Sequence, residues 1–205
     1  MNEEFKHIID KVTGLYQQYG IKSVTMDDVS RELGISKKTL YKYVSNKDEL
    51  VAHFVYYKEN DPKCGYDELK AQSSNAIEEL LIFNDYVIEM LKNYNPSTEF
   101  DLKKYYPELY SEFRKRRQEN MYRAVKENIE RGKEEGLYRS ELDEEIIAKV
   151  HISRIENSFA NEIFTIEELT SSRFVSEMMN YHIRGMVNNK GLKFLEDKLK
   201  EIESK

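Results

Sequence analysis

Residues 25–50 read TMDDVSRELGISKKTLYKYVSNKDEL, and this stretch decides the fold that we expect for the chain. Thr25 precedes Asp28 by three residues, which is the spacing of a capping box that opens a helix. Gly34 predicts the end of that helix, because glycine adopts a left-handed backbone conformation without steric cost. Ser36 can cap a second helix directly after the turn. Two short helices joined by a tight turn are typical of a helix-turn-helix.

The two short helices have an apolar inner face and a basic outer face. The apolar contact between them can come from Val29, Leu33, Ile35 and Leu40. The outward positions of the second helix carry cationic or hydrogen-bonding side chains: Lys37, Lys38, Thr39, Tyr41 and Lys42. Such side chains can pair with phosphates and donate to base edges in a major groove. The stretch therefore predicts a helix that binds double-stranded DNA.

Helical patterns continue on both sides of this stretch. Apolar residues at helical spacing predict an amphipathic helix over 5–19, and Asn46 starts a further helix after the motif. The sequence DPKCG at 61–65 then breaks the pattern. We therefore predict a helix-turn-helix domain at 1–46, a connecting helix at 47–60 and a larger helical domain at 61–205.

The remainder of the chain also has helical periodicity. It shows no alternating strand pattern, and the whole chain holds only three prolines and eight glycines. The expected helices lie over 66–92, 107–135, 143–159 and 166–187, with a short one from Gly191 to about Ile202. The predicted fold class is all-α, with an N-terminal three-helix domain, a larger C-terminal helical domain and about ten helices.

Charge is distributed unevenly along the chain. The formal net charge is −6, from 32 bases and 38 acids. Residues 1–60 hold nine of each, so the remainder carries 32 − 9 = 23 bases and 38 − 9 = 29 acids. Within the neutral part, the segment from Ser36 to Lys47 contains four lysines and no acid. A basic face on an acidic protein fits one end that contacts phosphate and a body that is repelled by it.

Several classes of protein do not fit the sequence. No apolar run approaches the roughly 18 residues that span a bilayer, and the charged start lacks the apolar segment of a signal peptide, so we expect a cytoplasmic protein without membrane contact. The single cysteine, Cys64, allows no disulfide within the chain. The four histidines have no metal-ligand spacing, and no phosphate-binding glycine loop or nucleophile motif is present. We expect no cofactor, no metal and no enzymatic activity.

The segment from Thr25 to Leu50 resembles the DNA-binding signature of the TetR family of bacterial regulators. The matching features are the helix-opening threonine, the Gly-Ile-Ser turn, the Thr-Leu-Tyr run and the Asn-Lys-x-x-Leu start of the next helix. Two positions depart mildly from the family pattern: Ser30 stands where alanine is common, and Val44 where phenylalanine is common. Neither change removes a group that the motif needs.

The resemblance implies roles in DNA binding by position. It implies contacts to DNA from Thr25, Ser36, Lys37, Lys38, Thr39, Tyr41, Lys42, Tyr43 and Lys47. Of these, Lys37 and Lys38 are the candidates for base edges, whereas Tyr41, Tyr43, Thr25 and Lys47 are the candidates for phosphates. The alternatives are that the tyrosines pack within the small domain and that the lysines form a solvated face.

The resemblance further implies a homodimer that pairs through the last two long helices, 143–159 and 166–187. The candidate interface residues are Ile147, Val150, Ile155, Phe159, Phe174, Met178, Met179 and Tyr181. The second helix is apolar around much of its circumference, which is more than one core face needs. Full burial within a monomer would produce the same pattern.

A pocket for a small apolar or aromatic ligand is also implied in the middle helices. The candidate residues are Phe83, Tyr86, Met90, Phe100, Tyr106, Tyr110, Phe113, Tyr122 and His151. The alternative is that these side chains are core packing or exposed tyrosines. Taken together, the sequence predicts a sequence-specific transcriptional regulator, a ligand-responsive repressor that binds its operator as a homodimer. The other readings are a regulator that activates or answers to a protein partner, and a non-catalytic helical interaction protein that has lost DNA binding.

Overall fold

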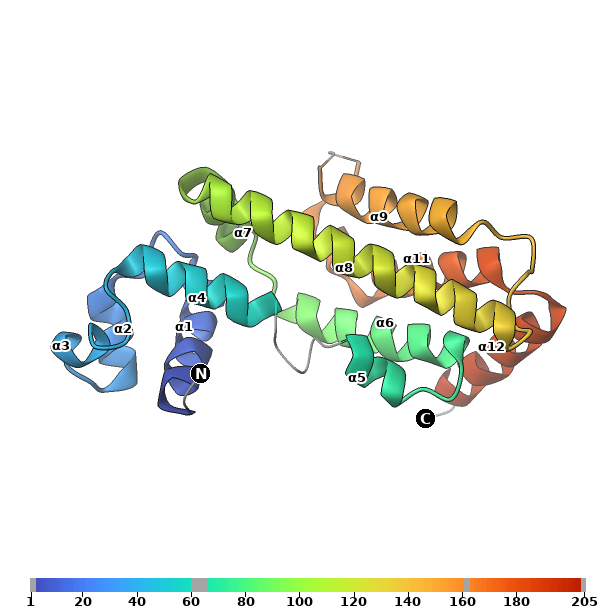
Figure 1. The fold of residues 1–205 in the computed structure, drawn as a ribbon, viewed down its shortest axis with the longest axis horizontal. Coiled ribbons are helices and arrows are strands. Elements are labelled where there is room, and N and C mark those ends of the chain that lie inside the picture. The colour runs from blue at the N-terminus through green and yellow to red at the C-terminus, as the bar shows by residue number, and fades with distance from the viewer. Residues whose placement is uncertain (1–2, 60–65, 161–162, 204–205) are drawn as a thin grey trace. The chain divides into compact units, whose positions relative to one another are not determined.

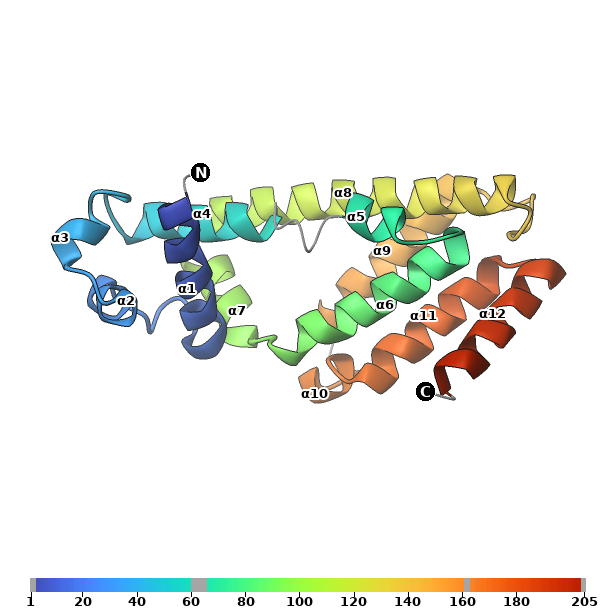
Figure 2. The same ribbon diagram turned by 90° about the horizontal axis from the view of Figure 1, so that it is seen from below.

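The computed structural model describes residues 3–59, 66–160 and 163–203. These residues form twelve helices and no extended strand (Figures 1 and 2). The predicted all-α class is confirmed. None of the helices in the described part of the chain is long and apolar enough to cross a membrane.

The helices group into two compact units. The N-terminal unit contains the described residues up to 59 together with 93–117, and the C-terminal unit contains 66–92 and 118–203. The long helix α8, Pro107–Glu134, therefore belongs to one unit by its beginning and to the other by its remainder. The boundary that the sequence indicates at 61–65 lies outside the described residues, and the domain limits at 46 and 61 stay predictions.

The N-terminal unit is built around an apolar core. Its helices are α1 Glu3–Tyr19, α2 Met26–Leu33, α3 Lys37–Leu40, α4 Lys47–Glu59, α7 Pro96–Tyr105 and the start of α8. The amphipathic stripe of α1 buries Ile8, Ile9, Val12 and Tyr16. The other helices add Val29, Leu40, Leu50, Val51, Phe54 and Leu102 to the same core. Complete burial of one such side chain stabilises the fold by about 1.5–3 kcal/mol.

Helix α7 packs against α1, although the sequence did not predict it. The pair Asn95-Pro96 reads as the end of a helix, but in the structure it begins one: Asn95 caps α7 and accepts a hydrogen bond from the Ser97 backbone at 2.9 Å. Pro96 fits the first turn, because that position needs no backbone N–H. The Thr98 hydroxyl donates to the Tyr16 carbonyl at 2.7 Å, which ties α7 to the end of α1.

The C-terminal unit contains the remaining helices. They are α5 Tyr66–Ala71, α6 Ala76–Lys92, the rest of α8, α9 Glu144–Ala160, α10 Ile166–Leu169, α11 Ser172–Met186 and α12 Asn189–Glu203. Helices α6 and α11 lie side by side over most of their length (Figure 2). The buried residues of this unit include Ile77, Leu80, Ile129, Tyr138, Ala148, Met179, Ile183 and Leu195.

Two stretches expected as single helices are each broken by a capping side chain. The predicted helix 66–92 is interrupted after Ala71, because the Asn75 amide oxygen accepts hydrogen bonds from the backbone of Ile77 and Glu78, both at 3.0 Å. The predicted helix 166–187 is interrupted because the Ser171 hydroxyl accepts from the Phe174 backbone at 3.2 Å. Short polar side chains compete in this way with helix continuation.

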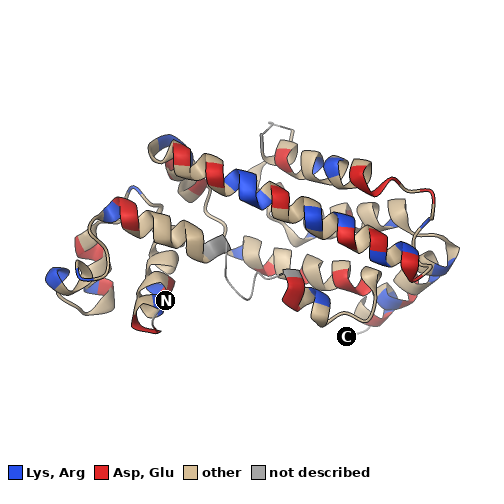
Figure 3. Cartoon of the chain, viewed as in Figure 1, with Lys and Arg blue, Asp and Glu red and all other residues tan. Residues whose placement is uncertain are grey.

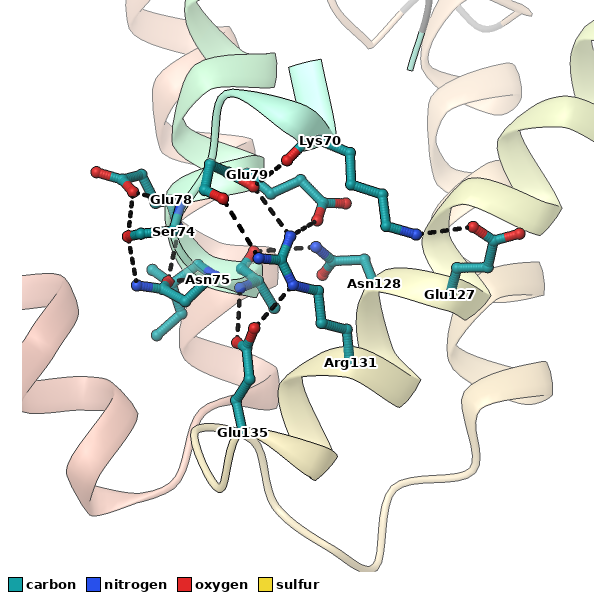
Figure 4. Close-up of polar contacts among 12 residues, drawn as sticks. Lys70, Ser74, Asn75, Glu78, Glu79, Glu127, Asn128, Arg131 and Glu135 are labelled. Carbon is teal, nitrogen blue, oxygen red and sulfur yellow. Dashed lines mark hydrogen bonds and ion pairs between the residues drawn. The ribbon is translucent and has the colours of Figure 1, made fainter. Parts of the chain in front are cut away.

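A buried polar network joins the turn before α6 to α8 (Figure 4). The Arg131 Nη1 atom lies 2.7 Å from Oε2 of Glu79, whose side chain is fully buried. The Arg131 Nε atom lies 2.7 Å from Oε1 of Glu135, and the other oxygen of Glu135 accepts from the Ala76 backbone at 2.8 Å. One arginine therefore compensates two carboxylates and fixes the start of α6 against α8.

We expect Arg131→Met to lower the free energy of unfolding by about 3 kcal/mol, because it leaves the buried Glu79 carboxylate without its guanidinium partner. Urea unfolding followed by far-UV circular dichroism measures the loss. The matched control is Arg184→Met, which removes an exposed 3.4 Å pair with Glu196 and should cost less than about 1 kcal/mol. Equal losses in the two variants would contradict the assigned role of Arg131.

Candidate nucleic-acid interface

The helix-turn-helix is held by the local hydrogen bonds that the sequence predicts. The Thr25 hydroxyl accepts from the Asp28 backbone at 3.2 Å, and the Asp28 carboxylate accepts from the Thr25 backbone at 2.9 Å, so both halves of the capping box form. The Asp28 carboxylate also accepts from the Thr25 hydroxyl at 2.6 Å, and this hydrogen bond, together with the one from the Thr25 backbone, holds the pKa of Asp28 below its ordinary value. Gly34 ends α2 at φ +65°, and the Ser36 hydroxyl caps α3 by accepting from the Thr39 backbone at 3.1 Å.

Apolar packing positions α3 on α2. Val29 and Leu40 are buried, and Leu33 and Ile35 pack against the same core from half-buried positions. Ser30 is also buried, and its hydroxyl donates to the Met26 carbonyl at 2.8 Å. The departure from alanine at this position therefore leaves no polar atom unsatisfied.

The outward side of α3 and the turn after it is polar and exposed. Tyr41 is 43% exposed, and Lys38 and Lys42 are exposed as well. In the described part of the chain, no carboxylate lies within ion-pair distance of Lys38 or Lys42. The two ammonium groups and the phenol are therefore available to an external anion.

Lys37 differs from these residues because it already has a partner. Its Nζ atom lies 3.0 Å from Oδ2 of Asp27, and this hydrogen bond raises the pKa of Lys37. Both side chains are exposed, so water screens the pair and it contributes little stability. Lys37 can exchange Asp27 for a DNA group at small cost. Thr39 is half-buried, and its hydroxyl lies 2.8 Å from that of Ser36.

Tyr43 faces the interior of the small domain. Its ring is half-buried and stacks on Phe5, with ring centroids 5.8 Å apart and an interplanar angle of 5°. A hydrogen bond to Glu4 raises the pKa of its phenol. These contacts favour the packing alternative for Tyr43, whereas the exposure of Tyr41 favours a contact to DNA.

A hollow next to the first residue of α4 brings together residues that the sequence did not group. It is lined by Lys22, Lys47, Asp48, Tyr105 and Tyr106. The Lys47 Nζ atom donates to the Lys22 carbonyl at 3.4 Å, and its pKa is lowered by burial and by the charge of Lys22. Burial, and then the charge of Asp48, raises the pKa of Tyr106 to about 12. From the sequence, the one signal that could have placed Lys22 near the DNA-binding motif is its position shortly before Thr25.

The nine candidate pocket residues are divided between the two units. Those in the N-terminal unit are Phe100, Tyr106, Tyr110 and Phe113, of which the last three pack against the core and Phe100 is exposed. Those in the C-terminal unit are Phe83, Tyr86, Met90, Tyr122 and His151. Tyr122 lines a shallow hollow with residues of α9, including Lys149 and Ile152. Neither unit by itself gathers all nine residues into one cavity.

Two histidines that are distant in sequence meet inside the C-terminal unit. The rings of His151 on α9 and His182 on α11 have centroids 4.0 Å apart, and both are buried. Nη2 of Arg154 lies 3.1 Å from Nδ1 of His151. Burial, followed by the charge of Arg154, lowers the pKa of His151 to about 4, and burial places that of His182 well below its ordinary value. Both imidazoles are therefore neutral at physiological pH.

The eight candidate interface residues differ in exposure. Val150 is 58% exposed and Tyr181 is 73% exposed, and Phe159 is also exposed. The half-buried members are Ile147, Ile155, Phe174 and Met178. Met179 is buried in the core of its own unit. Ile146, which the sequence did not single out, adds another exposed apolar side chain on α9.

Within residues 3–59, 66–160 and 163–203, no group of three or more histidine, cysteine or carboxylate side chains is placed to hold a metal ion.

Comparisons with known proteins agree with this architecture. Residues 8–54 match the family described as "Bacterial regulatory proteins, tetR family", which confirms the resemblance found in the sequence. This is a family of regulatory proteins, in agreement with the lack of catalytic motifs in the sequence. No curated protein matches the chain.

Solved structures resemble the fold over most of its length. A transcriptional regulator from Cytophaga hutchinsonii ATCC 33406 has a TM-score of 0.69 at 13% identity, covering 91% of this chain and 100% of its own. A TetR-family regulator from Agrobacterium tumefaciens has a TM-score of 0.65 at 16% identity, covering 88% and 96%. SmeT, the repressor of the Stenotrophomonas maltophilia multidrug efflux pump SmeDEF, has a TM-score of 0.58 at 14% identity, covering 90% of each chain. These similarities show the fold.

The buried histidines predict a loss of stability in mild acid. In the unfolded chain His151 takes up a proton below about pH 6.5, whereas in the folded protein it does so only near pH 4. The contribution of neutral His151 to the free energy of unfolding is therefore complete above about pH 6.5 and is lost as the pH falls toward 4. At pH 5 this difference lowers the free energy of unfolding by on the order of 2 kcal/mol relative to pH 7.5.

Urea unfolding at both pH values measures the effect. His151→Gln should reduce the acid-induced loss of stability by about 2 kcal/mol, because glutamine takes up no proton. The matched control is His7→Gln at an exposed position of α1, which should leave the loss unchanged. An unaltered pH dependence in His151→Gln would contradict the buried, neutral state of this imidazole.

Proposed function

We propose that this chain, whose residues 8–54 form a TetR-family domain, is a ligand-responsive repressor that binds operator DNA as a homodimer in the cytoplasm. The observation that supports DNA binding most directly is the outward side of α3. Lys38 and Lys42 lie there without a carboxylate partner among the described residues, and Tyr41 is exposed beside them. The fold shared with transcriptional regulators supports the same role.

In this proposal α3 lies in the major groove of the operator. Lys38, and Lys37 after release from Asp27, donate to base edges, for which the guanine O6 and N7 atoms are the preferred acceptors. Lys42, Tyr41, Ser36 and Thr39 contact the DNA next to this helix, and Thr25 and Lys47 contact phosphates at the starts of α2 and α4. Tyr43 supports the domain through its stack on Phe5 and does not need to touch DNA.

The homodimer would form through α9 and α11. Exposed apolar side chains on a stable unit indicate a surface that a partner covers. Here Ile146, Val150 and Phe159 on α9 and Tyr181 on α11 are such side chains. Two copies would present two α3 helices to successive half-sites about one DNA turn apart.

A ligand would act by changing the distance between the two α3 helices. A molecule that binds one dimer geometry better than the other shifts the population toward it, and DNA is then released or bound. We expect a small apolar or aromatic molecule in the C-terminal unit. Three functions compete with this proposal: a regulator that activates transcription, a regulator that responds to a protein partner, and an interaction protein without DNA binding. Operator binding with and without candidate ligands separates them.

Lys38→Ala and Tyr41→Ala should each weaken operator binding, because each removes a contact from the outward side of α3. A base contact contributes about 1–3 kcal/mol, so Lys38→Ala should raise Kd by a factor of roughly 5–150. Fluorescence anisotropy with a duplex selected by the protein from random sequences measures the change. Lys193→Ala, at an exposed position of α12, is the matched control and should leave Kd unaltered. Wild-type affinity in both α3 variants would contradict the assignment of the recognition helix.

Val150→Asp should dissociate the dimer, because it places a charge in the centre of the proposed apolar interface. Sedimentation equilibrium should show a monomer, and operator affinity should fall as a consequence. Met90→Asp, a similarly exposed apolar position on α6, is the control and should remain dimeric. A monomeric wild-type chain would overturn the homodimer proposal.

A further inference from the structure

A second basic surface lies in the N-terminal unit, outside the helix-turn-helix. It consists of Lys22 before α2, Lys47 at the start of α4, and Lys103, Lys104 and Tyr105 at the end of α7. We call this set the lysine flank. Lys22 and Lys47 line the hollow with Tyr105, and Lys22, Lys103 and Lys104 are exposed. Figure 3 shows basic positions at the start of α4 and at the end of α7.

The lysines of the flank have no carboxylate partners. None of the four lysines lies within ion-pair distance of a carboxylate belonging to the described residues. The acidic groups nearest to them are engaged in other contacts: Oδ2 of Asp101 accepts from the Lys22 backbone at 2.6 Å, and Asp48 accepts from the Tyr106 phenol. The exposed ammonium groups of Lys22, Lys103 and Lys104 are therefore available to an external anion, and half-buried Lys47 lies beside them within reach of the charges of Asp101 and Asp48.

Several lysines of the C-terminal unit are instead paired with glutamates. Lys70 lies 3.0 Å from Glu127, Lys133 lies 2.6 Å from Glu144, and Lys198 lies 3.5 Å from Glu78. These lysines are compensated by glutamates, whereas no ion pair with a carboxylate of the described residues holds the four lysines that gather in the flank. Like charges kept close together raise the free energy of the isolated protein, and a bound polyanion removes that cost.

Aromatic rings hold part of the flank in place. The Lys22 Nζ atom lies 4.5 Å from the ring centroid of Tyr105, and the Lys104 Nζ atom lies 5.3 Å from the centroids of both Tyr105 and Phe100. Rings attract a cation through their negative faces and leave its N–H groups available. The flank therefore presents ammonium groups in a defined arrangement on an aromatic support.

Hydrogen bonds fix α7 beside the DNA-binding motif. Thr98 donates to the Tyr16 carbonyl at 2.7 Å, and Asp101 holds the Lys22 backbone at 2.6 Å. Lys22 is three residues before Thr25, and Lys47 begins α4, so the flank adjoins the two helix starts where phosphate contacts are proposed. Lys104 lies against Tyr105, whose ring also meets Lys22, so the end of α7 adjoins the hollow at the start of α4.

We propose that the lysine flank binds the phosphate backbone of the operator, so that α7 takes part in DNA binding although it lies outside residues 8–54. This inference rests on the proposed function. The flank contributes affinity and salt dependence without reading sequence, because phosphate contacts carry no base information. Tyr105 adds a phenol that can donate to a phosphate oxygen beside the ammonium groups.

The test compares the full-length wild type with Lys103→Ala/Lys104→Ala and with Lys22→Ala. Fluorescence anisotropy gives Kd for the selected duplex and for a scrambled duplex across a series of salt concentrations. Each phosphate contact contributes about 0.9 to the slope of log Kd against log salt concentration, so the double variant should reduce the slope by nearly 2 on both duplexes. Lys22→Ala should reduce it by about 1. The ratio of the two affinities should stay at the wild-type value.

The matched control is Lys193→Ala/Lys200→Ala on α12, which removes the same charge from an exposed part of the C-terminal unit and should leave the slope unchanged. Wild-type slopes in both flank variants would overturn the inference. An equal reduction in the control would also overturn it, because the effect would then come from net charge alone. If the wild type selects no preferred duplex, the proposed sequence-specific function fails, while the slope on the scrambled duplex still decides whether the flank contacts phosphate.

Discussion

The burial of Leu40 is the constraint on which the proposed DNA-binding surface depends. Helix α3 has four residues, and a helix of that length does not form by itself in water. Its place is set by Leu40, which is fully buried against the core shared by α1, α2 and α4, and by the Ser36 cap at its start. Once Leu40 points inward, helical geometry turns Lys38, Tyr41 and Lys42 toward solvent. The interface is therefore a consequence of core packing on the opposite side of a single turn.

The lysines of the two units differ in charge compensation. In the C-terminal unit, Glu79 and Glu135 share Arg131, and Lys70 and Lys133 are each paired with a glutamate. In the N-terminal unit, Lys38, Lys42 and the lysines of the flank have no ion pair with a carboxylate of the described residues. Internal ion pairs thus stabilise the C-terminal unit, whereas these lysines of the N-terminal unit are available to an external polyanion.

Local signals in the sequence were reliable where a short segment decides its own conformation. The capping box at Thr25 forms as predicted, and Gly34 adopts the left-handed conformation that ends α2. The predicted helix boundaries that were wrong also depend on single residues. Asn75 and Ser171 stop helices whose apolar periodicity continues across the break, and Pro96 begins α7 where it was interpreted as an ending. Apolar periodicity predicts which face of a helix is buried. It does not predict whether a capping side chain will end the helix.

The sequence by itself determined the all-α class, the helix-turn-helix and the resemblance to the TetR family, because caps, turns and apolar stripes act over three or four residues. Only the tertiary structure decided which distant residues meet. It places His151 beside His182, Lys22 over Tyr105 and Met179 in the core of its own unit. These contacts depend on how helices pack, and many partners satisfy the same apolar face equally well. The DNA-binding motif was therefore visible in the sequence, whereas the lysine flank required the packing of α7 on α1.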